Sequence, residues 1–139
     1  MTLTLDLASE IARIAFAGGE ERGLKVMSVV VTDPGGHIRL AMRSDAQGNF
    51  GVDTALGKAR SALGFNRSSW SLQKTFVDAC GVSAITAATG GAFVPLGGAV
   101  VVQRDGVTIG AASISGGMPD VDHAVIVAAV EAVGLSVLP

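Results

Sequence analysis

The first third of the chain changes from helical to strand periodicity. Residues 4–22 carry apolar side chains at positions i, i+4, i+7 and i+8, which places them on one face of a helix. Thr4 is a suitable N-cap, and Gly23 suits the position just beyond the last turn. The pattern predicts an amphipathic helix that buries Leu7, Ile11, Ile14 and Ala15.

A β-hairpin is expected to follow this helix. Residues 25–32 are rich in β-branched side chains, and residues 37–43 alternate between polar and apolar. Between them, Pro34 presets the backbone of a turn and the glycines after it accept positive φ. In the second strand we expect an outward set of His37, Arg39, Ala41 and Arg43, and an inward set of Ile38, Leu40 and Met42.

The middle of the chain predicts a helix with an unusually small face. Residues 52–63 fit a helix in which Ala55, Ala59 and Ala62 share one side with Lys58. A lysine there either extends along the apolar surface to solvent or points into a pocket. Residues 64–92 are the least regular stretch, with one or two short helices expected within 65–76 and space for another within 77–91. A long connection of this kind is usually functional or mobile.

A second hairpin and a final helix complete the pattern. Residues 99–104 and 107–113 are predicted strands, and Asp105-Gly106 between them is typical of a type I′ turn. Pro119 suits the first position of a helix that ends before Gly134. The helix is expected to bury Val121, Val125, Ala128 and Ala132.

This order of elements indicates the fold class. Two hairpins bracket the central helices, and hairpins favour an antiparallel sheet. We therefore predict an α+β fold that forms a single domain over residues 1–139, with helices packed on the sheet.

Composition and charge exclude several classes of protein. Hydrophobic residues make up 49% of the 139 residues and charged residues only 16%, which excludes disorder. Because such a surface is poor in charge, self-association is expected. The net charge of −2, without a basic stripe, argues against nucleic-acid binding. The N-terminus lacks the basic start of a signal peptide, and no apolar run is long enough to span a bilayer, so we expect a cytoplasmic protein without membrane contact.

Candidate chemistry gathers around two regions. Arg43, Asp45 and Lys58 form one charged set, at a strand end, in the next loop and on the small helical face. The second is the glycine-rich stretch Ser115, Gly116 and Gly117 before the last helix, where backbone N–H groups can hold an anion. Asp122 and His123 begin that helix, and His123 is either a ligand, a general base or an ordinary exposed residue.

Three short motifs follow one another on the first hairpin and the helix after it. They read V-x-D-x-x-G, R-x-D-A and A-x-x-K-A. Their fixed residues are Val31, Asp33 and Gly36, then Arg43, Asp45 and Ala46, then Ala55, Lys58 and Ala59.

A glycine-rich stretch on the second hairpin completes the series. Its fixed residues are Ile109, Gly110, Ser115, Gly116, Gly117 and Asp122. Over nearly the whole chain, this succession resembles the GlcG/HbpS family, which includes the C-terminal domain of PduO-type proteins. The resemblance implies a profilin-like fold with a five-stranded antiparallel sheet flanked by helices, assembly into homo-oligomers and, for some members, haem binding.

The resemblance leads to two functional hypotheses. The first is a small-molecule-binding homo-oligomer that holds haem or a related tetrapyrrole at a subunit edge. The alternative is a cofactor-free lyase, hydratase or isomerase for a small carboxylated or carbonyl-containing metabolite, in which Lys58 and Arg43 bind the anion and Asp45, Asp122 or His123 moves the proton. A purely structural oligomer is a third reading. For the haem hypothesis the candidate binding residues are Arg43, Phe65, Ser115, Gly116, Gly117 and His123.

Overall fold

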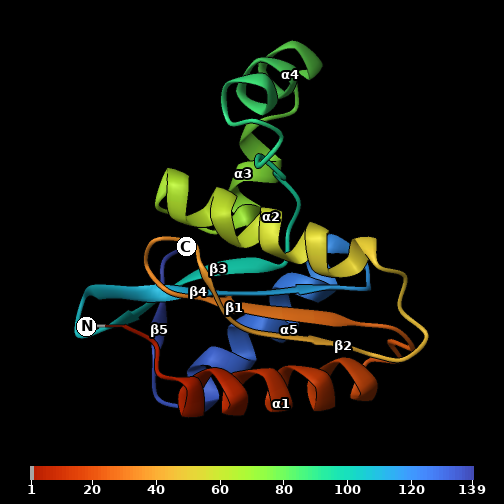
Figure 1. Ribbon diagram of the computed structural model, residues 1–139, viewed down its shortest axis with the longest axis vertical. Coiled ribbons are helices and arrows are strands. Elements are labelled where there is room, and N and C mark those ends of the chain that lie inside the picture. The colour runs from red at the N-terminus through yellow and green to blue at the C-terminus, as the bar shows by residue number, and fades with distance from the viewer. Residues whose placement is uncertain (1) are drawn as a thin grey trace.

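A five-stranded sheet lies between two layers of helices (Figure 1). The structure is a computed structural model that describes residues 2–139. In chain order the elements are α1 (Leu5–Glu21), β1 (Ser28–Thr32), β2 (Ile38–Arg43), α2 (Phe50–Phe65), α3 (Ser69–Thr75), α4 (Ala79–Ala88), β3 (Ala99–Arg104), β4 (Val107–Ser115), α5 (Pro119–Ala132) and β5 (Ser136–Val137).

The sheet has the order β2-β1-β4-β3-β5, and every neighbouring pair is antiparallel. Both predicted hairpins are present, as β1–β2 and β3–β4, and β1 pairs with β4 to join them. The fifth strand has only two residues, which pair with β3. Its existence was implied by the family resemblance, but the hydrophobic pattern did not locate it. The predicted α+β architecture is confirmed.

The main hydrophobic core lies on the face of the sheet covered by α1 and α5. Val29 and Val31 of β1 and Ile114 of β4 point into it and are fully buried. On the opposite face, α2 lies close to the sheet because its inner side is small. Its residues Ala55, Ala59 and Ala62 are fully buried, which confirms the predicted small face.

Two predicted burial patterns are wrong. In β2 only Leu40 of the inward set packs on the core, while Ile38 is 50% and Met42 37% exposed. The reason is that β2 is an edge strand of the sheet, so helices cover its inner face only in part. In α5, Ala128 and Ala132 are exposed, because the helix lies against both α1 and the sheet. Its buried side runs through Val125, as predicted, and otherwise through Ile126, Ala129 and Val130.

The irregular stretch contains two short helices. Ser68 caps α3 by accepting a hydrogen bond from the N–H of Ser71, and Asp78 caps α4 in the same way through Gly81. Figure 1 shows α4 projecting beyond α2 and α3, and no residue of α4 is buried. In the described residues 2–139, no helix has the length and apolar character needed to cross a membrane.

Candidate functional site

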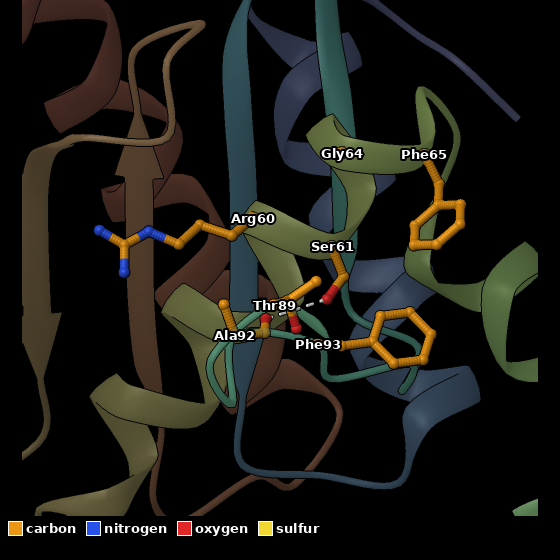
Figure 2. A pocket seen from close by; sticks show the side chains of 7 residues that line it. All are labelled: Arg60, Ser61, Gly64, Phe65, Thr89, Ala92 and Phe93. Carbon is orange, nitrogen blue, oxygen red and sulfur yellow. Dashed lines mark hydrogen bonds between the residues drawn. The ribbon is translucent and has the colours of Figure 1, made fainter. Parts of the chain in front are cut away.

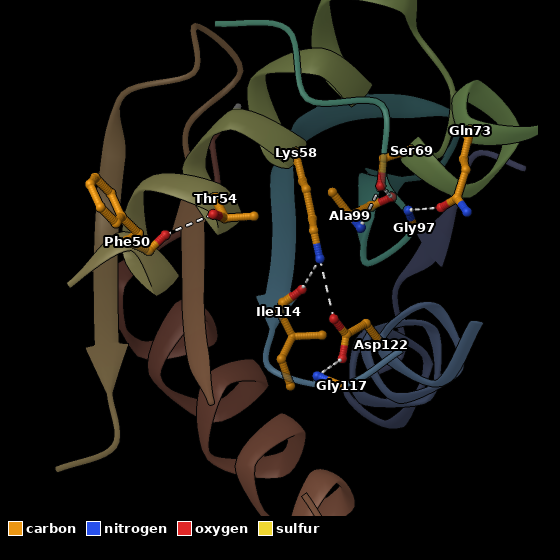
Figure 3. A network of polar contacts seen from close by, with 10 residues as sticks. All are labelled: Phe50, Thr54, Lys58, Ser69, Gln73, Gly97, Ala99, Ile114, Gly117 and Asp122. Atoms are coloured by element: carbon orange, nitrogen blue, oxygen red, sulfur yellow. Dashed lines mark hydrogen bonds and ion pairs between the residues drawn. The ribbon is translucent and has the colours of Figure 1, made fainter. Parts of the chain in front are cut away.

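A buried ion pair links the two helical layers. Lys58 extends from α2, and its Nζ lies 3.2 Å from Oδ2 of Asp122 in the first turn of α5 (Figure 3). The same ammonium donates a hydrogen bond of 3.1 Å to the carbonyl of Ile114. The other carboxylate oxygen, Oδ1, accepts from the N–H of Gly117 at 2.9 Å. Lys58 therefore points inward, and three of the predicted site residues meet.

Glycine at position 98 makes this meeting possible. Gly98 has φ +130°, in the region that favours glycine. A Cβ built there would lie 2.9 Å from Nζ of Lys58 and 3.0 Å from Cβ of Asp122. Any side chain at this position would therefore compete with the ion pair for space.

The ion pair is closed to solvent. Lys58 is 3% and Asp122 1% exposed. Burial lowers the pKa of Lys58 and raises the pKa of Asp122, and the attraction between the two charges opposes both shifts. Because each partner already satisfies the other, the pair leaves no open face for a substrate. This geometry does not favour the cofactor-free enzyme.

The remaining members of the predicted charged set lie elsewhere. Arg43 and Asp45 are exposed, at the end of β2 and in the loop after it. Arg43 stands opposite Ser28 of β1, which in turn stands opposite Ser115 of β4. Neither Arg43 nor Asp45 forms an ion pair within residues 2–139. The structure thus joins Lys58, Asp122 and Gly117, and leaves Arg43 and Asp45 at the surface.

His123 belongs to a separate aromatic cluster between α3 and α5. Its imidazole stacks on the indole of Trp70, with ring centroids 6.1 Å apart and an interplanar angle of 25°. The Nζ of Lys74 lies 5.4 Å from the Trp70 ring centroid. Burial, and to a smaller extent the charge of Lys74, lower the pKa of His123. The lowered pKa favours the neutral imidazole, and its buried Nδ1 has no hydrogen-bond partner among the described residues.

Trp70 and Lys74 are missing from the predicted site. The sequence signals available for them were the single tryptophan of the chain and a lysine one helical turn after it. Gly97 completes the arrangement, because a Cβ there would lie 2.7 Å from the indole and 2.6 Å from the carbonyl of Pro119. Glycine thus lets Trp70 lie against the start of α5.

Phe65 lies in a second aromatic cluster at the end of α2. Its ring centroid is 5.3 Å from that of Phe76 and 5.4 Å from that of Phe93. Phe65 and Phe93 line a hollow of ≈ 220 Å³, together with Arg60 on α2 (Figure 2). Pockets for drug-sized ligands usually span about 300–1,000 Å³, so this hollow is too small for a tetrapyrrole.

The chain resembles proteins of one family over almost its whole length. The profile of the family described as haem degrading protein HbpS-like matches residues 3–131. No curated protein sequence matches the chain. Three solved structures share the fold. A PduOC:haem complex is 21% identical, with a TM-score of 0.88 over 100% of both chains. The protein ORFY of Klebsiella pneumoniae is 23% identical, with a TM-score of 0.85 over 94% of this chain and 90% of that one.

The third structure, with 27% identity, is a double mutant of HbpS from Streptomyces reticuli. It has a TM-score of 0.82 over 96% of this chain and 88% of that one. The five-stranded antiparallel sheet and the match over residues 3–131 agree with the resemblance seen in the sequence motifs. The chain belongs to the HbpS-like family.

Proposed function

We propose that this protein binds haem, or a closely related planar tetrapyrrole, whose iron the imidazole of His123 would hold. The observation that carries the proposal is the half-buried imidazole stacked on Trp70, and burial lowers its pKa in favour of the neutral form. Neutral imidazole is the form that coordinates haem iron. The family description and the haem complex of the PduOC relative support the same ligand class.

The surroundings of His123 suit such a ligand. Trp70 offers a flat apolar surface, and the exposed ammonium of Lys74 lies beside it for the acidic groups that haem carries at its edge. We still predict that this ligand contacts Arg43, Phe65 and residues 115–117. When bound, the iron supplies redox and ligand-exchange chemistry, while these residues hold and orient the macrocycle.

We also propose that copies of the chain associate and that α4 lies in the interface. The helix is built mainly from alanine, valine and isoleucine, yet it buries no residue within one chain. Val77, just before it, is 82% exposed. Exposed apolar surface of this kind usually marks an interaction site. A site shared at a subunit edge accommodates a ligand larger than the hollow beside Phe65.

An absorbance titration with haemin, combined with native mass spectrometry, tests the proposal. We expect a saturable Soret band, one haem per chain and a mass above that of a single chain. His123→Ala should remove the coordinated spectrum. The matched control is His37→Ala, because the His37 side chain is 79% exposed and contacts Asp33 rather than an aromatic ring. A titration that never saturates, or equal spectra for both variants, contradicts this function.

A further inference from the structure

Two hollows adjoin on the outer side of α2. The first, of ≈ 220 Å³, lies between Phe65 and the segment after α4 that contains Phe93. The second, of ≈ 280 Å³, lies between α2 and residues 34–36 of the first hairpin. Arg60 and Gly64 line both hollows, so the two meet across this turn of the helix. A Cβ at Gly64 would touch no atom within 4 Å, and the absent side chain leaves the passage open.

The first hollow forms the aromatic end of a groove that the two hollows make together. Phe93 is 5% exposed and fixed in the structure, whereas Phe65 is 39% exposed and offers part of its ring to the hollow. The two rings are tilted by 51°, which leaves a ring surface available for an edge or face contact with a third ring. The hydroxyl groups at this end are already used. Ser61 donates to the carbonyl of Gly57, and Thr89 donates to that of Ile85.

The second hollow forms the cationic end of the same groove. Nε of Arg60 donates a hydrogen bond of 3.1 Å to the carbonyl of Gly36, which holds the guanidinium at this side. Figure 2 shows the guanidinium directed away from Phe65 and Phe93. Arg60 is exposed and has no carboxylate within ion-pair distance in residues 2–139. Its remaining N–H groups are therefore free to bind an anion in a bidentate manner.

We infer that the Arg60–Gly64–Phe65 groove binds a small aryl-alkyl carboxylate, with the ring against Phe65 and Phe93 and the carboxylate on Arg60. The groove has an aromatic end and an uncompensated cation, with the open passage at Gly64 between them. Its ligand therefore needs an apolar ring, a short spacer and one acidic group. The size agrees, because a cavity of about 150 Å³ already holds benzene. The groove contains neither His123 nor Trp70, and it shares only Phe65 with the predicted haem contacts.

Calorimetric titration with 3-phenylpropanoate as the probe tests the inference on the full chain. Arg60→Gln should weaken binding about ten-fold or more, as expected for losing a charge-assisted hydrogen bond. Arg13→Gln is the matched control, since it makes the same charge change on an exposed position of α1. Gly64→Leu should abolish binding by filling the passage. A Cβ at this position meets no neighbouring atom and leucine favours the helix, so the fold should be retained.

Each result of these titrations either supports or contradicts the proposed groove. Binding that is lost in Gly64→Leu and weakened in Arg60→Gln, with a cooperative melting transition retained and an unchanged haemin titration, supports the groove. The neutral amide 3-phenylpropanamide should bind about as weakly as the acid binds to Arg60→Gln. Equal affinity for the acid and the amide overturns the inference, and so does wild-type affinity in Gly64→Leu. No saturation at about 10 mM probe, a concentration suited to a fragment of this size, also overturns it, including the case in which a second copy covers the groove.

Discussion

Lys58 and Asp122 are buried as a pair, and each offsets part of the cost of burying the other. We predict that Lys58→Met lowers the free energy of unfolding by about 3 kcal/mol or more, because it leaves the Asp122 carboxylate buried without its cation. The N–H of Gly117 alone does not compensate for that charge. Urea denaturation of the variant and the wild type measures the difference.

The double variant Lys58→Met/Asp122→Leu is the informative control. Replacing both charges by apolar side chains should recover most of the lost stability. Lys25→Met serves as the surface control and should change the free energy of unfolding by less than about 0.5 kcal/mol, because Lys25 is exposed. A double variant as unstable as the single one would show that Lys58 acts through packing rather than through charge.

His123 gives the fold a defined response to pH. Burial and Lys74 lower its pKa below the ordinary value of 6.5, so the unfolded chain binds the proton more readily than the folded chain. The stability that this difference contributes is present above pH 6.5 and is lost as the pH falls toward the folded pKa. We therefore predict that His123→Gln reduces the loss of stability between about pH 7.5 and about pH 5, as measured by urea denaturation. An unchanged pH profile in this variant would contradict the assignment.

At the scale of elements, α4 differs from the other helices because it contributes nothing to the core. We predict that Ala84→Arg reduces the mass of the assembly seen by native mass spectrometry, since a guanidinium in an apolar interface lacks a partner. The isolated chain should tolerate the change, because Ala84 is exposed. Ala128→Arg on α5 is the matched control, an exposed alanine on a different helix. Equal masses for both variants would remove α4 from the interface.

Helices and strands differ in how well their sequence patterns predict burial. The small face of α2 was predictable, because three alanines at helical spacing have few other uses. The buried side of α5 was not, because periodicity alone does not reveal that the helix contacts both α1 and the sheet. In β2 only Leu40 of the predicted inward set packs on the core, because the pattern carries no information on whether a strand is central or at an edge.

For the whole molecule, the hairpins and the order of elements were predictable from local signals, and the family motifs supplied the number of strands. The candidate site was predictable only in part. Lys58 and Asp122 are 64 residues apart, and their contact depends on how α2 and α5 meet at one end of the sheet. The sequence did not predict Trp70 or Arg60 as site residues. A stacking partner or an unpaired cation can be identified only when the three-dimensional positions of distant segments are known.

The edge position of β2 limits how this sheet can grow. Its backbone groups are available for pairing, but Arg39 and Arg43 are both exposed along the strand. If two copies paired antiparallel about Ala41, each Arg39 would face the other copy's Arg43, and like charges directly opposite one another repel. This repulsion disfavours growth of the sheet through β2 in that register, and so hinders the step by which folded copies would join edge to edge into a continuous β-fibre.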